Sequence, residues 1–245
     1  MTFLPQLAPW QWTIGLACAF FVGLGKTGLP GLGILVVPLM VLMVGDARQS
    51  AGWLLPVMCT ADLFAVYYWR HNTAAKRMFS LAPWVIAGMA VGTAALGLSE
   101  RVLRPVVGVI VLVMLALYVR RRLRSHQVDV PVHAAPYGIA TGFATTVANA
   151  AGPVMSLYLL SKRLSKEDFV ATGAWFFFVI NLTKVPIYAG YGLFTRSSLA
   201  FDLAMVPAVF AGAFAGRWVV RHAPQGLFEA LVVALTAVST LMLFN

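Results

Sequence analysis

Apolar residues along this chain come in ten runs, separated by short polar stretches or by stretches rich in glycine and proline. Six runs approach the roughly 20 residues that an α-helix needs to cross about 30 Å of hydrocarbon. Inside a bilayer the backbone must satisfy its own hydrogen bonds, so the pattern predicts an all-α, polytopic membrane protein. The ten runs cover residues 10–24, 30–44, 50–69, 79–98, 103–119, 136–150, 153–161, 169–191, 199–219 and 227–244.

The order of features along the chain predicts two related halves, residues 1–124 and 125–245. Each half has five runs, and five is odd, so the two copies are expected in opposite orientations, as inverted-topology repeats. Each small-xxx-small pair taken alone is interpreted as helix packing. The features that recur at an offset of 122 to 124 residues are Gly88 and Gly92 with Gly212 and Gly216, Leu103 with Leu227, and Trp53 with Trp175.

Composition strengthens the membrane interpretation. Apolar residues make up 60% of the chain and charged residues 11%, against about 45–50% and about 25% in soluble domains. A soluble enzyme of this size is therefore excluded. The net charge of +10 does not indicate nucleic-acid binding, because the basic residues lie between apolar runs. Thirteen of them are assigned to one side of the bilayer and four to the other, which predicts that both termini are outside.

Each half opens with a pair of short runs, broken by glycine and proline at residues 23–31 and 145–153. Interrupted helices at matching positions of two repeats indicate a transporter's substrate site. The N-termini of half-helices carry partial positive charge and attract anions. Pro30 and Pro153 are expected in the first turns of the helices that follow the breaks, and Gly28 and Gly31 are expected to let the backbone approach a ligand. If the short pairs re-enter instead of spanning, the lysine in the first break lies at mid-membrane. The candidate substrate-binding residues in the breaks are Lys26, Thr27, Gly28, Pro30 and Gly31 in the first half, and Asn149, Gly152 and Pro153 in the second.

Two charged residues lie well inside predicted spans, Asp62 in the third run and Lys184 in the eighth, and they are separated by the same offset of 122 residues as Trp53 and Trp175. Charges at such depth are costly and are therefore paired or functional by default. We predict that Asp62 pairs with Lys184 when no substrate is bound; the alternative is that Asp62 takes up a proton. Asn181 lies one turn before Lys184 on the same helix face, and both are counted as substrate-binding candidates.

The sequence contains no catalytic constellation, no phosphate-binding loop and no metal-ligand spacing. We therefore expect no enzyme activity, no cofactor and no metal. Cys18 and Cys59 are the nucleophile candidates, and both fall inside apolar runs, where a cysteine usually acts as a small buried apolar residue.

The glycine-rich opening at residues 25–38 resembles that of the TauE/SafE sulfite exporter family, and residues 149–160 and 173–186 resemble its second-half counterparts. The resemblance covers almost the whole chain. It implies a multi-pass permease of the bacterial inner membrane that moves sulfite or small organosulfur anions. This chain has Lys26 and Thr27 where the family opening is usually a run of glycines, which points to a subgroup with a different anion.

These observations together predict a secondary transporter that exports sulfite, thiosulfate or an organosulfonate, with one half rocking against the other. Its partners are then a small sulfur-containing anion and the lipid bilayer. Two alternative functions stay open: an anion channel, and an intramembrane enzyme that uses Cys18 or Cys59. Assembly of the protein as a homodimer is left open as well.

Overall fold

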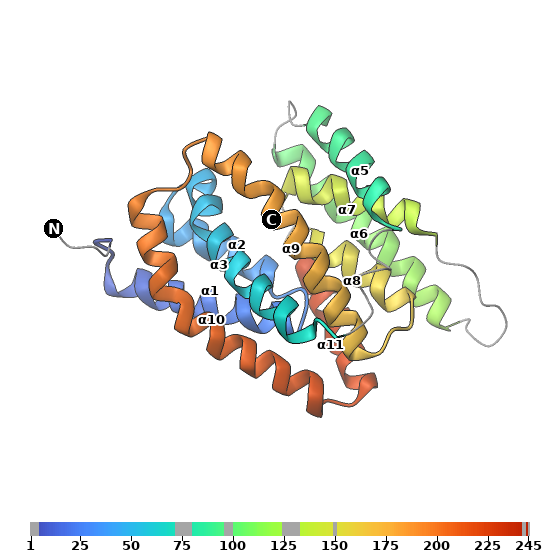
Figure 1. The fold of residues 1–245 in the computed structure, drawn as a ribbon. Coiled ribbons are helices and arrows are strands. Elements are labelled where there is room, and N and C mark those ends of the chain that lie inside the picture. Colours follow the sequence, from blue (N-terminus) through green and yellow to red (C-terminus); the bar gives the residue numbers. More distant parts are fainter. Residues whose placement is uncertain are drawn as a thin grey trace. The chain divides into compact units, whose positions relative to one another are not determined.

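The computed structural model describes residues 5–71, 80–95, 100–123, 133–148, 151–241 and 244. Within these ranges the chain forms ten helices and no strand, as the apolar pattern predicts (Figure 1). The helices are α1 (Pro9–Thr27), α2 (Gly33–Val44), α3 (Ala47–Trp69), α5 (Ala82–Ala95), α6 (Glu100–Leu123), α7 (Ala134–Ala148), α8 (Ala151–Ser161), α9 (Lys166–Gly190), α10 (Arg196–His222) and α11 (Gln225–Leu241).

Among the described residues, four helices are long and apolar enough to cross a membrane, namely α3, α6, α9 and α10. The sequence predicted six. The two that differ are α5, with 14 residues, and α11, with 17. At about 1.5 Å per residue both fall short of 30 Å of hydrocarbon. The predicted run at residues 79–98 extends at both ends beyond the residues that form α5.

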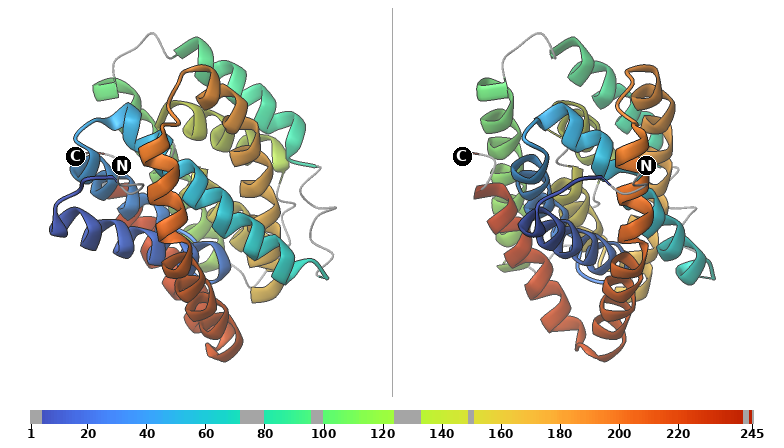
Figure 2. Two further views of the ribbon diagram at one scale, coloured as in Figure 1. Left: turned by 60° about the vertical axis from the view of Figure 1, so that its left-hand side comes forward. Right: turned by 90° about the vertical axis from the view of Figure 1, so that its left-hand side faces the viewer.

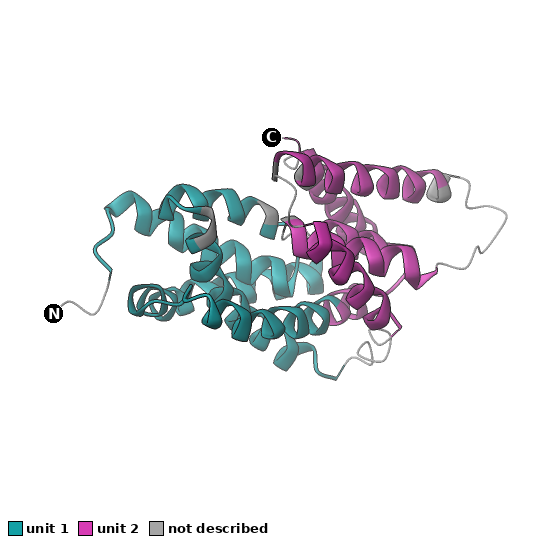
Figure 3. Cartoon of the chain, turned by 90° about the horizontal axis from the view of Figure 1, so that it is seen from above, with its two compact units in different colours: residues 1–72, 173–224 teal, residues 73–172, 225–245 magenta. Residues whose placement is uncertain are grey.

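The chain folds into two compact units, each assembled from two separate stretches (Figure 3). Unit 1 comprises Met1–Asn72 and Gly173–Pro224, and unit 2 comprises Thr73–Thr172 and Gln225–Asn245. Unit 1 therefore contains α1, α2, α3, most of α9 and α10. Unit 2 contains α5, α6, α7, α8 and α11. Packing thus combines helices from both sequence halves within each unit.

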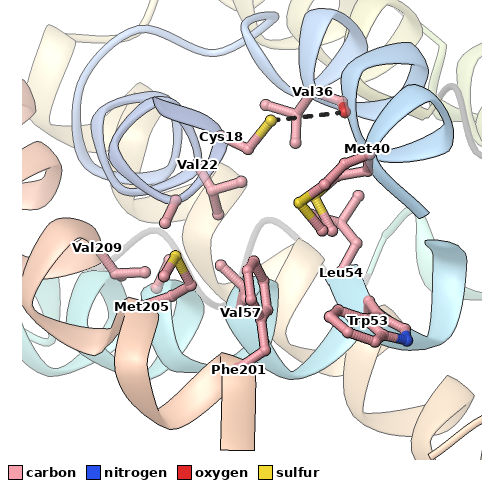
Figure 4. Packing of buried hydrophobic residues seen from close by; sticks show 13 residues of the cluster. Cys18, Val22, Val36, Met40, Trp53, Leu54, Val57, Phe201, Met205 and Val209 are labelled. Carbon is pink, nitrogen blue, oxygen red and sulfur yellow. Dashed lines mark hydrogen bonds between the residues drawn. The ribbon is translucent and has the colours of Figure 1, made fainter. Parts of the chain in front are cut away.

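The core of unit 1 lies where α1, α2, α3 and α10 pack together (Figures 2 and 4). Trp53 of α3 packs its ring against Phe201 of α10, with centroids 5.1 Å apart. The capping residues fix where two of these helices begin. The Asp46 carboxylate accepts from the Gln49 N–H at 2.7 Å before α3, and the Thr195 hydroxyl accepts from the Ser198 N–H at 3.0 Å before α10.

Glycines allow α1 to lie directly against α10. A Cβ added at Gly212 would meet the Phe20 carbonyl, and one added at Gly23 would meet the Val209 carbonyl. In unit 2, α5 and α7 pack in the same manner, because a Cβ at Gly88 would meet the Ile139 carbonyl and one at Gly142 the Val85 carbonyl. The small-xxx-small pairs are therefore helix-packing motifs in both units, as predicted. The inverted orientation of the two halves stays a prediction.

Candidate functional site

The first predicted break lies between α1 and α2 in unit 1. Helix α1 ends at Thr27, where the Gly28 N–H donates back to the Leu24 carbonyl at 2.9 Å. Gly31 has φ 107°, a left-handed conformation that glycine adopts readily. Helix α2 begins only at Gly33, so Pro30 lies in the turn before that helix and not in its first turn, where we expected it.

Gly28 lies where the backbones of the break and α10 are closest. A Cβ added there would come within 2.5 Å of the Gly216 Cα, so a larger residue would push α1 away from α10. The glycine predicted to let backbone approach a ligand thus already lets one helix approach another. Whether Gly28 also contacts an anion stays a prediction.

Thr27 is fully buried next to this contact. Its hydroxyl donates to the Gly23 carbonyl at 3.0 Å and to the Ala213 carbonyl of α10 at 2.7 Å. The one hydroxyl proton is thereby shared between two backbone oxygens. An anion would receive a hydrogen bond from Thr27 only if both of these contacts were given up.

Lys26, one residue before the end of α1, forms a buried ion pair. Its Nζ lies 2.7 Å from Asp62 Oδ1 of α3, and its ammonium also lies 4.4 Å from the centre of the Phe177 ring of α9. The Asp62 side chain is fully buried and that of Lys26 is 14% exposed. The second carboxylate oxygen, Asp62 Oδ2, accepts from the Asn181 amide of α9 at 2.6 Å. Three elements of unit 1 therefore converge on one carboxylate.

The ion pair brings the end of α1 close to the middle of α3. Helix α3 has 23 residues, and Asp62 lies four residues past its midpoint, about 6 Å along the axis. Because Lys26 contacts Asp62 directly, its ammonium lies near the middle of an apolar helix long enough to span. This position agrees with the alternative in which Lys26 lies at mid-membrane.

Lys184 of α9 also belongs to this neighbourhood. It is partly buried, and it lies within electrostatic range of Lys26, Asp62 and Cys59. The ion pair that the structure shows for Asp62 involves Lys26, a partner that the repeat offset did not indicate. Direct pairing of Asp62 with Lys184 stays a prediction. Asn181, predicted as a polar neighbour of Lys184, donates to Asp62.

The second predicted break belongs to unit 2, before α8. Pro153 is the third residue of α8, so it lies in the first helical turn, as predicted. A Cβ added at Gly152 would meet no described atom within 4 Å. Asn149 lies outside the described residues.

The two cysteines have different surroundings. Cys18 is 1% exposed, and its thiol lies 4.0 Å from the Val36 carbonyl in the core of unit 1 (Figure 4). Cys59 of α3 is partly buried, one turn before Asp62. In the part of the chain that the structure describes, no group of three or more histidine, cysteine or acidic residues could hold a metal ion.

A comparison with family models decides the family. The model described as "Sulfite exporter TauE/SafE" matches residues 15–243, nearly the whole chain. The chain belongs to the TauE/SafE sulfite exporter family. No curated protein and no solved structure matches it. As a TauE/SafE protein with four helices long enough to span among its described residues, it is a multi-pass membrane transporter.

Two features of this TauE/SafE protein were not predicted. In the sequence, Phe177 is only one residue of an apolar run. Its contact with the Lys26 ammonium is a tertiary contact, which sequence spacing does not reveal. Asp202 is a buried acidic residue inside α10. The sequence did contain an indication of Asp202, because it is a charged residue inside an apolar run, as Asp62 is.

Proposed function

We propose that this protein is a secondary transporter that exports sulfite, or another small sulfur-containing anion such as thiosulfate or an organosulfonate, across the bacterial inner membrane. Membership of the TauE/SafE family supports the cargo class and the direction. The observation that carries the proposal is the buried ion pair of Lys26 with Asp62 beside the α1–α2 break. In our proposal the buried Lys26 ammonium is the positive charge that attracts the anion inside the membrane.

In this proposal the anion competes with Asp62 for Lys26. A lysine ammonium has three N–H donors, so it can bind an incoming oxyanion as one of its contacts to the carboxylate is released. The N-terminus of α2 adds partial positive charge next to the break. No side chain caps that terminus in the described structure. The terminus lies close to α1, because a Cβ placed at Gly25 of α1 would be 3.5 Å from Leu32, the residue before α2. The anion-binding residues are then Lys26 and the first turn of α2, with Gly31 shaping the turn between them.

Proton coupling follows from the same exchange of partners. When the anion takes Lys26, Asp62 becomes a buried carboxylate without its cation, which costs several kcal/mol. Taking up a proton removes that charge. Asn181 suits both forms, because an amide can donate to a carboxylate or accept from a carboxylic acid. A monoanion and a proton then enter the site together, and the net charge of the site does not change.

Gly152 and Pro153 are the second and third residues of α8 in unit 2, and Asn149 precedes the helix in sequence. We propose the same role for the N-terminus of α8, which is to present backbone N–H groups to an anion. Lys184 and Asn181 stay in the proposal as polar side chains that the anion meets after Lys26. Thr27 is proposed to support the break and not to contact the anion, because its hydroxyl is engaged by backbone.

Flux measurements in proteoliposomes test the proposal. Purified protein is reconstituted and assayed for counterflow of labelled sulfite, thiosulfate, sulfoacetate and sulfate, with and without a pH gradient. We expect saturable counterflow of at least one sulfur-containing anion, and accumulation that depends on the pH gradient. No flux of any of the four would contradict a transport function. Flux without counterflow would replace the carrier with a channel.

The binding role of Lys26 is tested by removing its charge. We expect Lys26→Ala to abolish anion binding. The variant also leaves Asp62 buried without its cation, a loss worth about 3–5 kcal/mol, so it can fail for lack of stability alone. The matched control is Lys26→Ala combined with Asp62→Asn, which removes both charges. We expect the double variant to regain stability in a thermal-shift assay and still to bind no anion. Anion binding by the folded double variant would show that Lys26 is not the ligand.

A further inference from the structure

Asp202 lies on the buried face of α10. Its side chain is 8% exposed, and it shares that face with Ser198, Met205 and Val209, which follow the three-to-four-residue spacing of one helix side. This is the face that packs against α1 and α3. Asp202 therefore points neither to lipid nor to bulk water.

The Asp202 carboxyl group lacks the partners that Asp62 has. Among the described residues, neither of its oxygens has a hydrogen-bond partner. Asp62, by contrast, has a lysine on one oxygen and an amide on the other. Burying an ionised carboxylate without a cation or a donor costs several kcal/mol, and far less when the group is a neutral acid.

The helices packed on α10 offer Asp202 no compensating charge in the described structure. Helix α1 carries Cys18, which faces Val36, and Lys26, which is paired with Asp62. Helix α3 brings the Cys59 thiol within electrostatic range of Asp202, and a neutral thiol balances no charge. The other charged residues of α3 are Asp62, which is paired with Lys26, and Arg48, whose side chain lies outside the described structure. On α10 itself the nearest cation in sequence is Arg196, exposed about 9 Å away along the axis.

We infer that Asp202 is a second proton-binding site of this transporter, protonated in the conformation seen here, and that it exchanges its proton with water when transport exposes it. The two acids then differ in timing. Asp62 takes a proton only when an anion occupies Lys26, whereas Asp202 holds one in the empty protein. The protonated state of Asp202 follows from its burial, and its part in coupling rests on the proposed transport function.

Infrared spectroscopy tests the protonated state without any transport. Purified protein near pH 7 is compared with variants for the C=O stretch of a buried carboxylic acid, identified by its shift in heavy water. We expect the band in the wild type and in Asp62→Asn, and its loss in Asp202→Asn. Should Asp202→Asn fold poorly by circular dichroism, Asp202→Glu should move the band and keep it. A band that survives Asp202→Asn unchanged overturns the assignment, as does a wild type without the band.

Transport assays test the coupling. We expect Asp202→Asn to keep anion counterflow in the absence of a pH gradient. With a pH gradient, the variant should accumulate less anion than the wild type. Full gradient-driven accumulation by this variant would remove Asp202 from coupling. A wild type that transports no anion would contradict the proposed function and the coupling role together, while the infrared band would still report the proton on Asp202.

Discussion

Thr27 and Lys26 are neighbours in sequence, yet their side chains contact different helices. The Thr27 hydroxyl ties α1 to α10 through the Ala213 carbonyl, while the Lys26 ammonium extends to Asp62 of α3. The last turn of α1 is therefore held from two sides. Substitutions at the two residues therefore test different functions. The Thr27 hydrogen bond holds α1 against α10, whereas the Lys26 ion pair neutralises the Asp62 carboxylate.

At Thr27 we predict a loss of stability without a loss of affinity. Thr27→Val keeps the shape of the side chain and removes the hydroxyl that donates to Gly23 and Ala213. The free energy of unfolding should fall by about 1–3 kcal/mol, because buried carbonyls lose a donor. Thermal unfolding in detergent measures this, and the anion dissociation constant should change less than about threefold, under 1 kcal/mol. A large loss of affinity in stable protein would return Thr27 to the list of ligands.

In unit 1, the sequence predicted residues that the structure brings together, but it did not predict how they pair. Lys26 was predicted from the glycine-rich break, Asp62 from its charge inside an apolar run, and Asn181 from its place one turn before Lys184. The repeat offset suggested Lys184 as the partner of Asp62, but an offset gives corresponding positions in two copies and not distances. Contact between α1 and α3 depends on how the helices pack, which one sequence does not specify.

At the scale of elements, the fold depends on two helix pairs held by glycine. Helices α1 and α10 meet in unit 1, and α5 and α7 meet in unit 2, in each case backbone against backbone. The hydrophobic pattern located the ten helices of the described residues, since burial in lipid or protein favours continuous apolar runs. The predicted runs at residues 79–98 and 227–244 continue past the described ends of α5 and α11.

These pairs should not tolerate a single added methyl group. Gly212→Ala places a Cβ against the Phe20 carbonyl, and Gly88→Ala does the same against Ile139. Backbone atoms cannot move aside as a flexible side chain can, so each change should reduce the yield of folded protein and lower its melting temperature. Size-exclusion chromatography and thermal unfolding measure both effects.

Gly226→Ala is the matched control for this pair of variants, because a Cβ there meets no described atom within 4 Å in α11. It should leave folding unchanged or slightly improved. Normal stability of Gly212→Ala would mean that α1 and α10 lie farther apart than the structure places them.

At the scale of the whole molecule, the basic residues are assigned unevenly to the two sides of the membrane. The structure moves Lys26 from the loops to a buried pair, which leaves twelve of the thirteen residues assigned to the cytoplasmic side. The excess over the four on the other side persists, so the predicted orientation does not depend on Lys26.

We therefore predict that both termini face away from the cytoplasm. A protease-cleavable tag at the C-terminus should be removed from intact spheroplasts by added protease, and a tag inserted after Arg124 should be cut only after lysis. The opposite pattern would invert the assignment of every loop. An even number of crossings also requires that a tag at the N-terminus behaves like the one at the C-terminus.

The neutral pair formed by Lys26 and Asp62 has an electrical consequence. Moving one elementary charge through a potential of 100 mV involves about 2.3 kcal/mol, whereas a cation and an anion 2.7 Å apart move through the field with almost no net work. If the empty carrier resets with this pair closed, its return step is insensitive to voltage. Any dependence of turnover on membrane potential then reports the charge of the cargo and its accompanying protons.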